Sequence, residues 1–169
     1  MTAAAQQAET ARQQDEEDYR MYDYLDQPVA NLDHGGRFLI WSMRHWVQAM
    51  HDRQCPACVI GPAFMKWRMM PGLAPFQTMM ATLNLHARHD ISFAPCRCAH
   101  VSEDEALLIG LIVGTRQRTA EAMTETLALV VDEDRVTALR DSIAALAEIM
   151  AGVSILPGKP APVTPPAAK

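Results

Sequence analysis

The sequence predicts an all-α protein, a compact bundle of five or six helices with irregular cysteine-containing loops and disordered tails. Apolar residues recur at helical spacing in several segments, and no strong alternating pattern typical of a β-strand occurs. A capping box, Ser102 followed by Glu105, precedes the most apolar run. At 169 residues, the chain is long enough to bury a core without disulfide bonds.

Composition divides the chain into one domain and two tails. Residues 1–27 carry seven acidic and two basic residues, a balance that equals the whole net charge of −5. Residues 28–155 form a single helical domain, whose first part, 28–100, is basic and contains every Cys, His and Trp. Its second part, 101–155, is acidic and is interpreted as helical scaffold. Residues 156–169 are rich in Pro and Ala, and we expect both tails to be disordered.

The first predicted helix covers residues 35–53. Phe38 and Trp41 lie on one face of it, at a spacing of three residues. Pro56 cannot continue this helix and biases Cys55 away from the α conformation. Cys55 is therefore placed at the end of the helix or just past it.

The next segment is interrupted by proline and glycine. A short helical turn is predicted over residues 62–70, and Pro71-Gly72 ends it. A helix from about 75 to 89 follows, and residues 90–101 are irregular. The second cysteine pair therefore lies in a connection between helices.

Three helical segments complete the domain, at 103–118, 119–131 and 133–151. The last has the clearest pattern, with Gly152 where a C-cap glycine belongs and an apolar stripe at alternating spacings of three and four. The stripe consists of Val136, Leu139, Ile143, Leu146 and Met150. We expect it to pack within the bundle, with a homodimer seam through 136–150 as the alternative.

Composition also predicts a cytoplasmic protein. The acidic N-terminus has no apolar segment typical of a secretion signal, and the apolar run 106–114 is too short to span a membrane. The net charge of −5 argues against a general nucleic-acid footprint. Because cytoplasmic thiols stay reduced, clustered cysteines there indicate metal binding or redox chemistry.

The four cysteines form two short pairs, an arrangement typical of structural zinc sites. Cys55 and Cys58 have the usual CxxC spacing, whereas the single residue between Cys96 and Cys98 is shorter than usual. His100 could replace Cys98 as the partner of Cys96. These five residues are the predicted zinc ligands, and an iron–sulfur cluster is the alternative cofactor. Reduced cysteines that act as small apolar residues are the other possibility.

A redox dithiol at Cys55 and Cys58 is a further interpretation. Thioredoxin-like CxxC motifs open a helix after a strand, whereas a helix precedes this one. A CxxC in an all-helical protein resembles the alkylhydroperoxidase D family, whose motif is Cys-x-x-Cys-x-x-x-His. Pro62 stands where this family has its proton-relaying histidine, so membership is not expected.

The sequence also contains two weaker clusters. His86, His89 and Asp90 share a helical face at i, i+3 and i+4, which suggests a second metal site or a polar helix terminus. A basic and aromatic patch could bind an anionic ligand or a partner, although arginines over a Trp-containing core would give the same pattern. The residues of this patch are Arg37, Arg44, Trp46 and Arg53.

Together, these patterns predict a small metal-binding protein that acts as an adaptor, regulator or accessory subunit through contacts with another protein. No phosphate loop, nucleophile elbow or zincin motif is present, so no catalytic residue is expected. A thiol- or metal-based redox enzyme or sensor is the alternative function. A nucleic-acid-binding regulator is the third.

Overall fold

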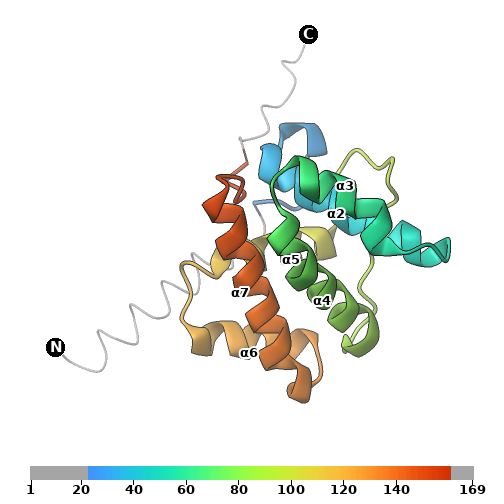
Figure 1. The fold of residues 1–169 in the computed structure, drawn as a ribbon. Coiled ribbons are helices and arrows are strands. Elements are labelled where there is room, and N and C mark those ends of the chain that lie inside the picture. The colour runs from blue at the N-terminus through green and yellow to red at the C-terminus, as the bar shows by residue number, and fades with distance from the viewer. Residues whose placement is uncertain (1–22, 161–169) are drawn as a thin grey trace, which may run out of the picture.

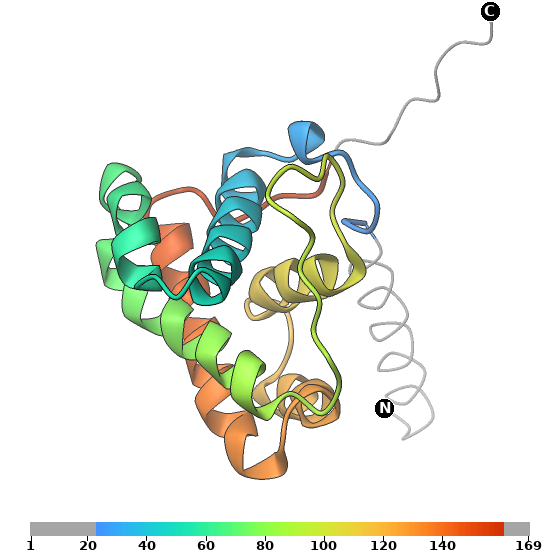
Figure 2. The ribbon, with the colours of Figure 1, turned by 90° about the vertical axis from the view of Figure 1, so that its right-hand side faces the viewer.

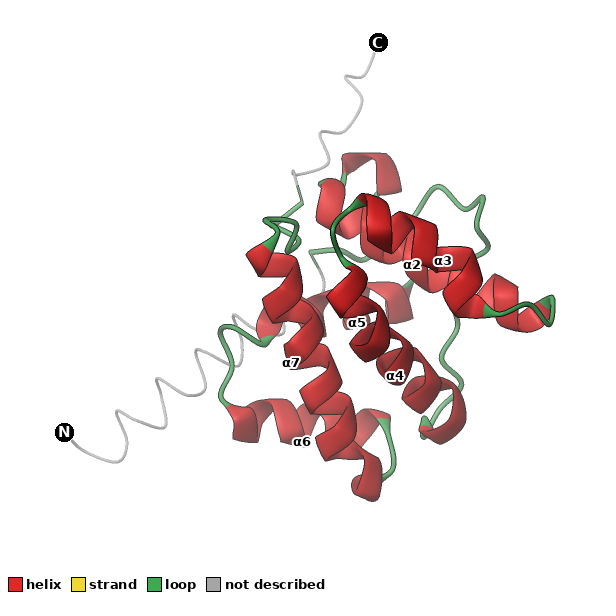
Figure 3. Cartoon of the chain, in the orientation of Figure 1, coloured by secondary structure: helices red, strands yellow, loops and turns green. Residues whose placement is uncertain are grey.

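A computed structural model describes residues 23–160, which fold into a bundle of six α-helices (Figures 1 and 3). These are α2 (His34–His51), α3 (Pro56–Lys66), α4 (Met70–His86), α5 (Glu103–Gly114), α6 (Ala120–Val130) and α7 (Val136–Gly152), with 3-10 turns η1 (Val29–Asn31) and η2 (Glu133–Arg135). This range contains isolated β-bridges but no strand. The predicted all-α class and helix number are confirmed.

No helix within residues 23–160 combines the length and apolarity needed to cross a membrane. The predictions for residues 1–22 and 161–169 lie outside the described residues. Residues 23–27, assigned by composition to the first tail, contact the domain: Tyr24 is buried, and Asp26 N donates to Val101 O at 3.1 Å.

Helix α7 is central to the packing. It packs along α4 and also contacts α5 and α6, while α2 packs against α3 and α5 (Figure 1). The five residues of the α7 stripe are each no more than 3% exposed and belong to the core of this chain. The stripe therefore packs within the bundle, and its side chains are not available at the surface for a dimer seam.

Two helix starts differ from the sequence prediction, and both involve proline. Helix α3 begins at Pro56, before the turn expected at 62–70, and α4 begins at Met70, with Pro71 in its first turn. Proline is well accommodated there because the first N–H groups of a helix have no intrahelical partner. The two prolines therefore lie in the first turns of helices and do not end the preceding ones.

The C-terminus of α7 also differs from expectation. Gly152 is the last residue of the helix, and Ser154 takes the left-handed conformation with φ 59°. Ser154 N donates to Ala151 O at 3.0 Å, and Ile155 N donates to Met150 O at 2.9 Å. This pair of bonds is a Schellman motif, in which the left-handed position favours glycine.

Ser154→Gly is therefore expected to raise the free energy of unfolding by about 1 kcal/mol, because glycine removes the steric cost of the left-handed conformation. The midpoint temperature of thermal unfolding should rise by about 2–4 °C. Ser154→Ala is the control, since alanine keeps the Cβ and should give no gain. Equal effects of the two substitutions would contradict the assigned conformation.

The segment after α7 crosses the start of α2 (Figure 2). Asp33 caps α2 by accepting from Gly36 N at 2.8 Å, and its second oxygen accepts from Gly158 N at 2.7 Å. Tyr24 O–H donates to Gly158 O at 2.8 Å. We call residues 153–160 the C-terminal strap. Its residues 156–160 come from the predicted tail, but they are held against the domain by these bonds.

Candidate functional site

Cys55 and Cys58 lie at the start of α3. Cys55 is its N-cap residue, with the extended backbone angles φ −74° and ψ 110°, and Pro56 is the first helical residue. Cys55 O accepts from Cys58 N at 3.0 Å and from Val59 N at 3.2 Å, which closes the first turn. This turn places the two cysteines at the same end of α3.

The end of α2 positions this pair. Arg53 takes the left-handed conformation with φ 55°, and Gln54 N donates to Ala49 O at 2.8 Å. These features form a Schellman motif that ends α2 at His51, four residues before Cys55. The chain then turns directly into α3, so the cysteines occupy a short and well-defined corner.

Both cysteines are exposed, and neither forms a disulfide within the described residues. The pKa of Cys55 lies below its usual value, first because the Cys58 thiol donates a hydrogen bond to it and then because the backbone N–H groups of Cys58 and Ala57 approach the sulfur. The same contact with Cys55 raises the pKa of Cys58. Free N–H groups and the dipole at a helix start favour a thiolate in this way.

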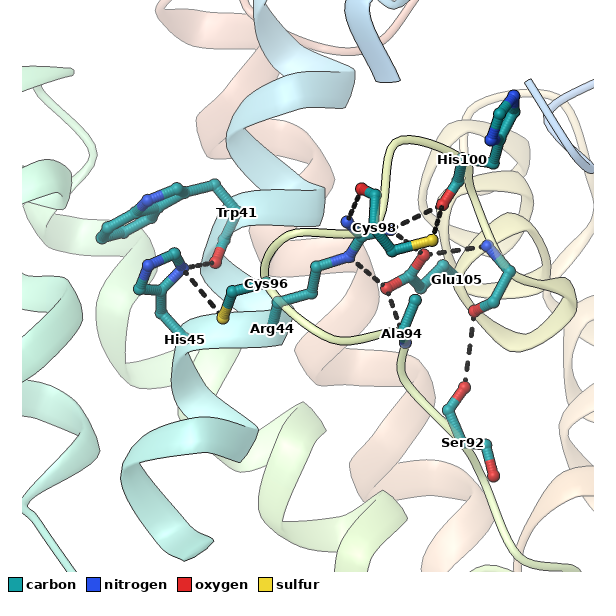
Figure 4. Close-up of polar contacts among 10 residues, drawn as sticks. Trp41, Arg44, His45, Ser92, Ala94, Cys96, Cys98, His100 and Glu105 are labelled. Carbon is teal, nitrogen blue, oxygen red and sulfur yellow. Dashed lines mark hydrogen bonds and ion pairs between the residues drawn. The ribbon is translucent and has the colours of Figure 1, made fainter. Parts of the chain in front are cut away.

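The other cysteines lie in the loop between α4 and α5. Cys96 Sγ is 4.0 Å from Nδ1 of His45, and the His45 ring stacks on Trp41 with centroids 4.1 Å apart. Because the Trp41 carbonyl, 2.8 Å from Nδ1, can only accept, Nδ1 carries the hydrogen. The Cys98 thiol donates to His100 O at 3.4 Å. Figure 4 shows the Cys96 and Cys98 sulfurs on opposite sides of the Arg44 side chain.

A buried ion pair fixes this loop. Arg44 donates to both carboxylate oxygens of Glu105, at 2.7 and 2.8 Å, and the two side chains are 3% and 0% exposed. Arg44 also donates to the carbonyls of Cys98 and His100, at 2.6 and 2.7 Å (Figure 4). The hydrogen bond with Glu105 is the main reason that the pKa of Arg44 is raised.

Glu105 serves three segments at once. Its carboxylate accepts from Ser102 N at 2.9 Å, which confirms the predicted capping box, and from Ala94 N at 3.2 Å. Together with Arg44, these bonds join α2, α5 and the second half of the loop. The sequence signal for this pair is one charged residue among the buried, mostly apolar residues of each helix, Arg44 in α2 and Glu105 in α5.

The predicted basic and aromatic patch is divided between the interior and the surface. Arg44 and Trp46 are buried, whereas Arg37 and Arg53 are exposed. The Arg44 guanidinium is occupied by Glu105 and two carbonyls. Only Arg37 and Arg53 of this set therefore face solvent.

The predicted zinc ligands lie in two separate places. Cys55 and Cys58 follow the end of α2 at His51, whereas Cys96 lies beside His45. His45 precedes His51 by six residues, which corresponds to about 9 Å along the helix axis. Zinc–sulfur bonds of about 2.3 Å require the ligands to meet at one point. Among residues 23–160, no three His, Cys, Asp or Glu side chains are arranged to hold a metal ion. The zinc and iron–sulfur assignments therefore stay predictions.

The second predicted metal cluster is also divided. His86 is half-buried, and its Nδ1 is 3.9 Å from Asp132 Oδ2. His89 and Asp90 are exposed and line a cavity of about 430 Å³ beside Trp46. His86 thus faces the turn between α6 and η2, whereas the other two residues line this cavity.

Comparisons with known proteins give no relative. No protein-family model matches the sequence, and neither the curated proteins nor the solved structures include a significant match.

Proposed function

We propose that this chain is a thiol–disulfide exchange protein in which Cys55 attacks and Cys58 resolves. The observation that carries the proposal is the corner at the start of α3, where an N-cap cysteine and a first-turn cysteine are both exposed and in contact. The role belongs to the redox alternative that the sequence left open. It requires neither a β-strand before the motif nor a histidine at position 62.

The reaction is a two-electron exchange. The Cys55 thiolate attacks one sulfur of a substrate disulfide, forms a mixed disulfide and releases the first substrate thiolate. The Cys58 thiolate then attacks the Cys55 sulfur and releases the second. The substrate is reduced to two thiols, and the protein is oxidised to a Cys55–Cys58 disulfide with loss of two protons. The same steps in reverse oxidise a substrate dithiol.

The environments of the two sulfurs support these roles. A lowered pKa gives Cys55 a larger thiolate fraction at neutral pH than an ordinary cysteine has. A raised pKa keeps Cys58 protonated, so that it donates to the Cys55 thiolate until the mixed disulfide forms. Each sulfur is exposed and can therefore meet a substrate.

We expect oxidised glutathione to convert the wild-type protein to a Cys55–Cys58 disulfide, whereas Cys58→Ser should stop at a Cys55–glutathione mixed disulfide. The rate should rise with pH through a midpoint below the usual cysteine range, because the Cys55 pKa is lowered. Mass spectrometry of acid-quenched samples measures both products.

Cys58→Ala is the matched control for the pH profile. Serine retains a donor to the Cys55 sulfur and alanine does not, so the midpoint should be higher in Cys58→Ala than in Cys58→Ser. A mixed disulfide that forms first at Cys96 or Cys98 would contradict the proposal.

A further inference from the structure

An apolar groove begins at the proposed dithiol. It has a volume of about 470 Å³ and runs along α3 to the first turns of α4. Its main lining residues are Cys58, Pro62, Met65, Lys66, Met70 and Leu73. Met65 and Met70 are 68% and 43% exposed, although both are large and apolar. Flexible, polarisable methionine side chains are well suited to a surface that binds varied apolar groups.

Positive charge lies in this groove and beside its lining residues in the sequence. Lys66 lines it, while Arg53 precedes the dithiol and Arg68 follows the end of α3. All three residues are exposed, and none forms an ion pair with another residue in the range 23–160. An acidic group on a bound molecule would therefore be favoured beside the groove.

We propose that this groove binds the polypeptide substrate of the dithiol, an extended segment with an apolar and an acidic side chain near its disulfide cysteine. The inference rests on the proposed exchange function and names its substrate class. A polypeptide fits better than a small disulfide because the groove extends well beyond the sulfurs. Interactions remote from the reacting atoms can then contribute to rate.

Helix geometry sets the length of the segment. Cys58 and Lys66 are eight residues apart in α3, which corresponds to about 12 Å. An extended chain covers this distance with about four residues. The acidic side chain should therefore lie about four positions from the disulfide cysteine, with an apolar side chain between them.

The test uses two disulfides with the same chromophoric leaving group, thionitrobenzoate. One carries the peptide Asp-x-Leu-x-Cys-x-Leu-x-Asp, which offers the pattern in both chain directions, and the other carries mercaptoethanol. Attack by Cys55 releases the chromophore, and Cys58 then releases the peptide or mercaptoethanol. With the full chain, we expect the peptide disulfide to react about tenfold faster.

Met65→Ser should remove most of this advantage, so that the peptide disulfide reacts little faster than the mercaptoethanol disulfide. Leu129→Ser, at a leucine 71% exposed on α6, is the matched control and should change neither rate. Lys66→Glu should reverse the charge preference, so that a peptide with Lys in place of Asp becomes the faster substrate.

The outcomes separate the two proposals. If Cys55 reacts with neither disulfide, the exchange function fails. If both disulfides react equally well, or if Met65→Ser slows both alike, exchange stands and the groove proposal is overturned. A peptide advantage that disappears as protein concentration rises would show a second copy of the chain in the groove and would also overturn it.

Discussion

Glu105→Ala is expected to lower the free energy of unfolding by about 3–5 kcal/mol, because it leaves the Arg44 guanidinium buried without its counter-charge. The variant also removes the acceptor for Ala94 N and Ser102 N. Urea unfolding should measure the loss, and hydrogen exchange should show faster exchange at these two amides.

Two variants separate the buried pair from helix capping in general. Glu103→Ala removes an exposed acid from the same first turn of α5 and should cost no more than about 1 kcal/mol. Arg44→Met combined with Glu105→Leu should recover much of the lost stability, because neither charge then stays buried alone. A cost below 1 kcal/mol for Glu105→Ala would contradict the buried pair.

Gly35→Ala is expected to lower the free energy of unfolding by about 3 kcal/mol. Gly35 lies in the first turn of α2, and a Cβ added there would meet the backbone oxygen of Ile155, which cannot move aside as a side-chain end could. Either α2 or the C-terminal strap must shift. The midpoint temperature of thermal unfolding should fall by about 6–12 °C.

Gly152→Ala is the control for this substitution. A Cβ at Gly152 meets nothing within 4 Å, and the residue is helical, so alanine should stabilise the protein by about 0.5–1 kcal/mol. A Gly35→Ala variant as stable as the wild type would show that the strap does not pack against α2 in solution.

Local signals explain how far the sequence predicts the fold. The Ser102 capping box and the apolar stripe of α7 locate their helices because cap and periodicity act within a few residues. The starts of α3 and α4 were predicted wrongly at Pro56 and Pro71, because proline fits both after a helix end and in the first turn of a helix. The C-cap of α7 was predicted at Gly152, but hydrogen bonds hold Ser154, a non-glycine residue, in the left-handed conformation.

The site was predicted only in part, for a similar reason. The CxxC spacing identifies Cys55 and Cys58, but the role of Cys55 as N-cap depends on where α3 begins. The Arg44–Glu105 pair links two helices distant in sequence, and no local pattern specifies that contact. The spacing of Cys96 and Cys98 likewise gives no indication that their sulfurs point apart (Figure 4).

The central claim, that Cys55 and Cys58 form a redox dithiol, is tested most directly by a redox titration of the purified full-length protein. Samples equilibrated in dithiothreitol buffers of graded potential are acid-quenched, alkylated and mapped by mass spectrometry. We expect one two-electron transition that joins Cys55 to Cys58, while Cys96 and Cys98 remain thiols. Cys55 and Cys58 that resist both oxidation and alkylation until a chelator removes bound metal would contradict the claim and favour the predicted zinc site.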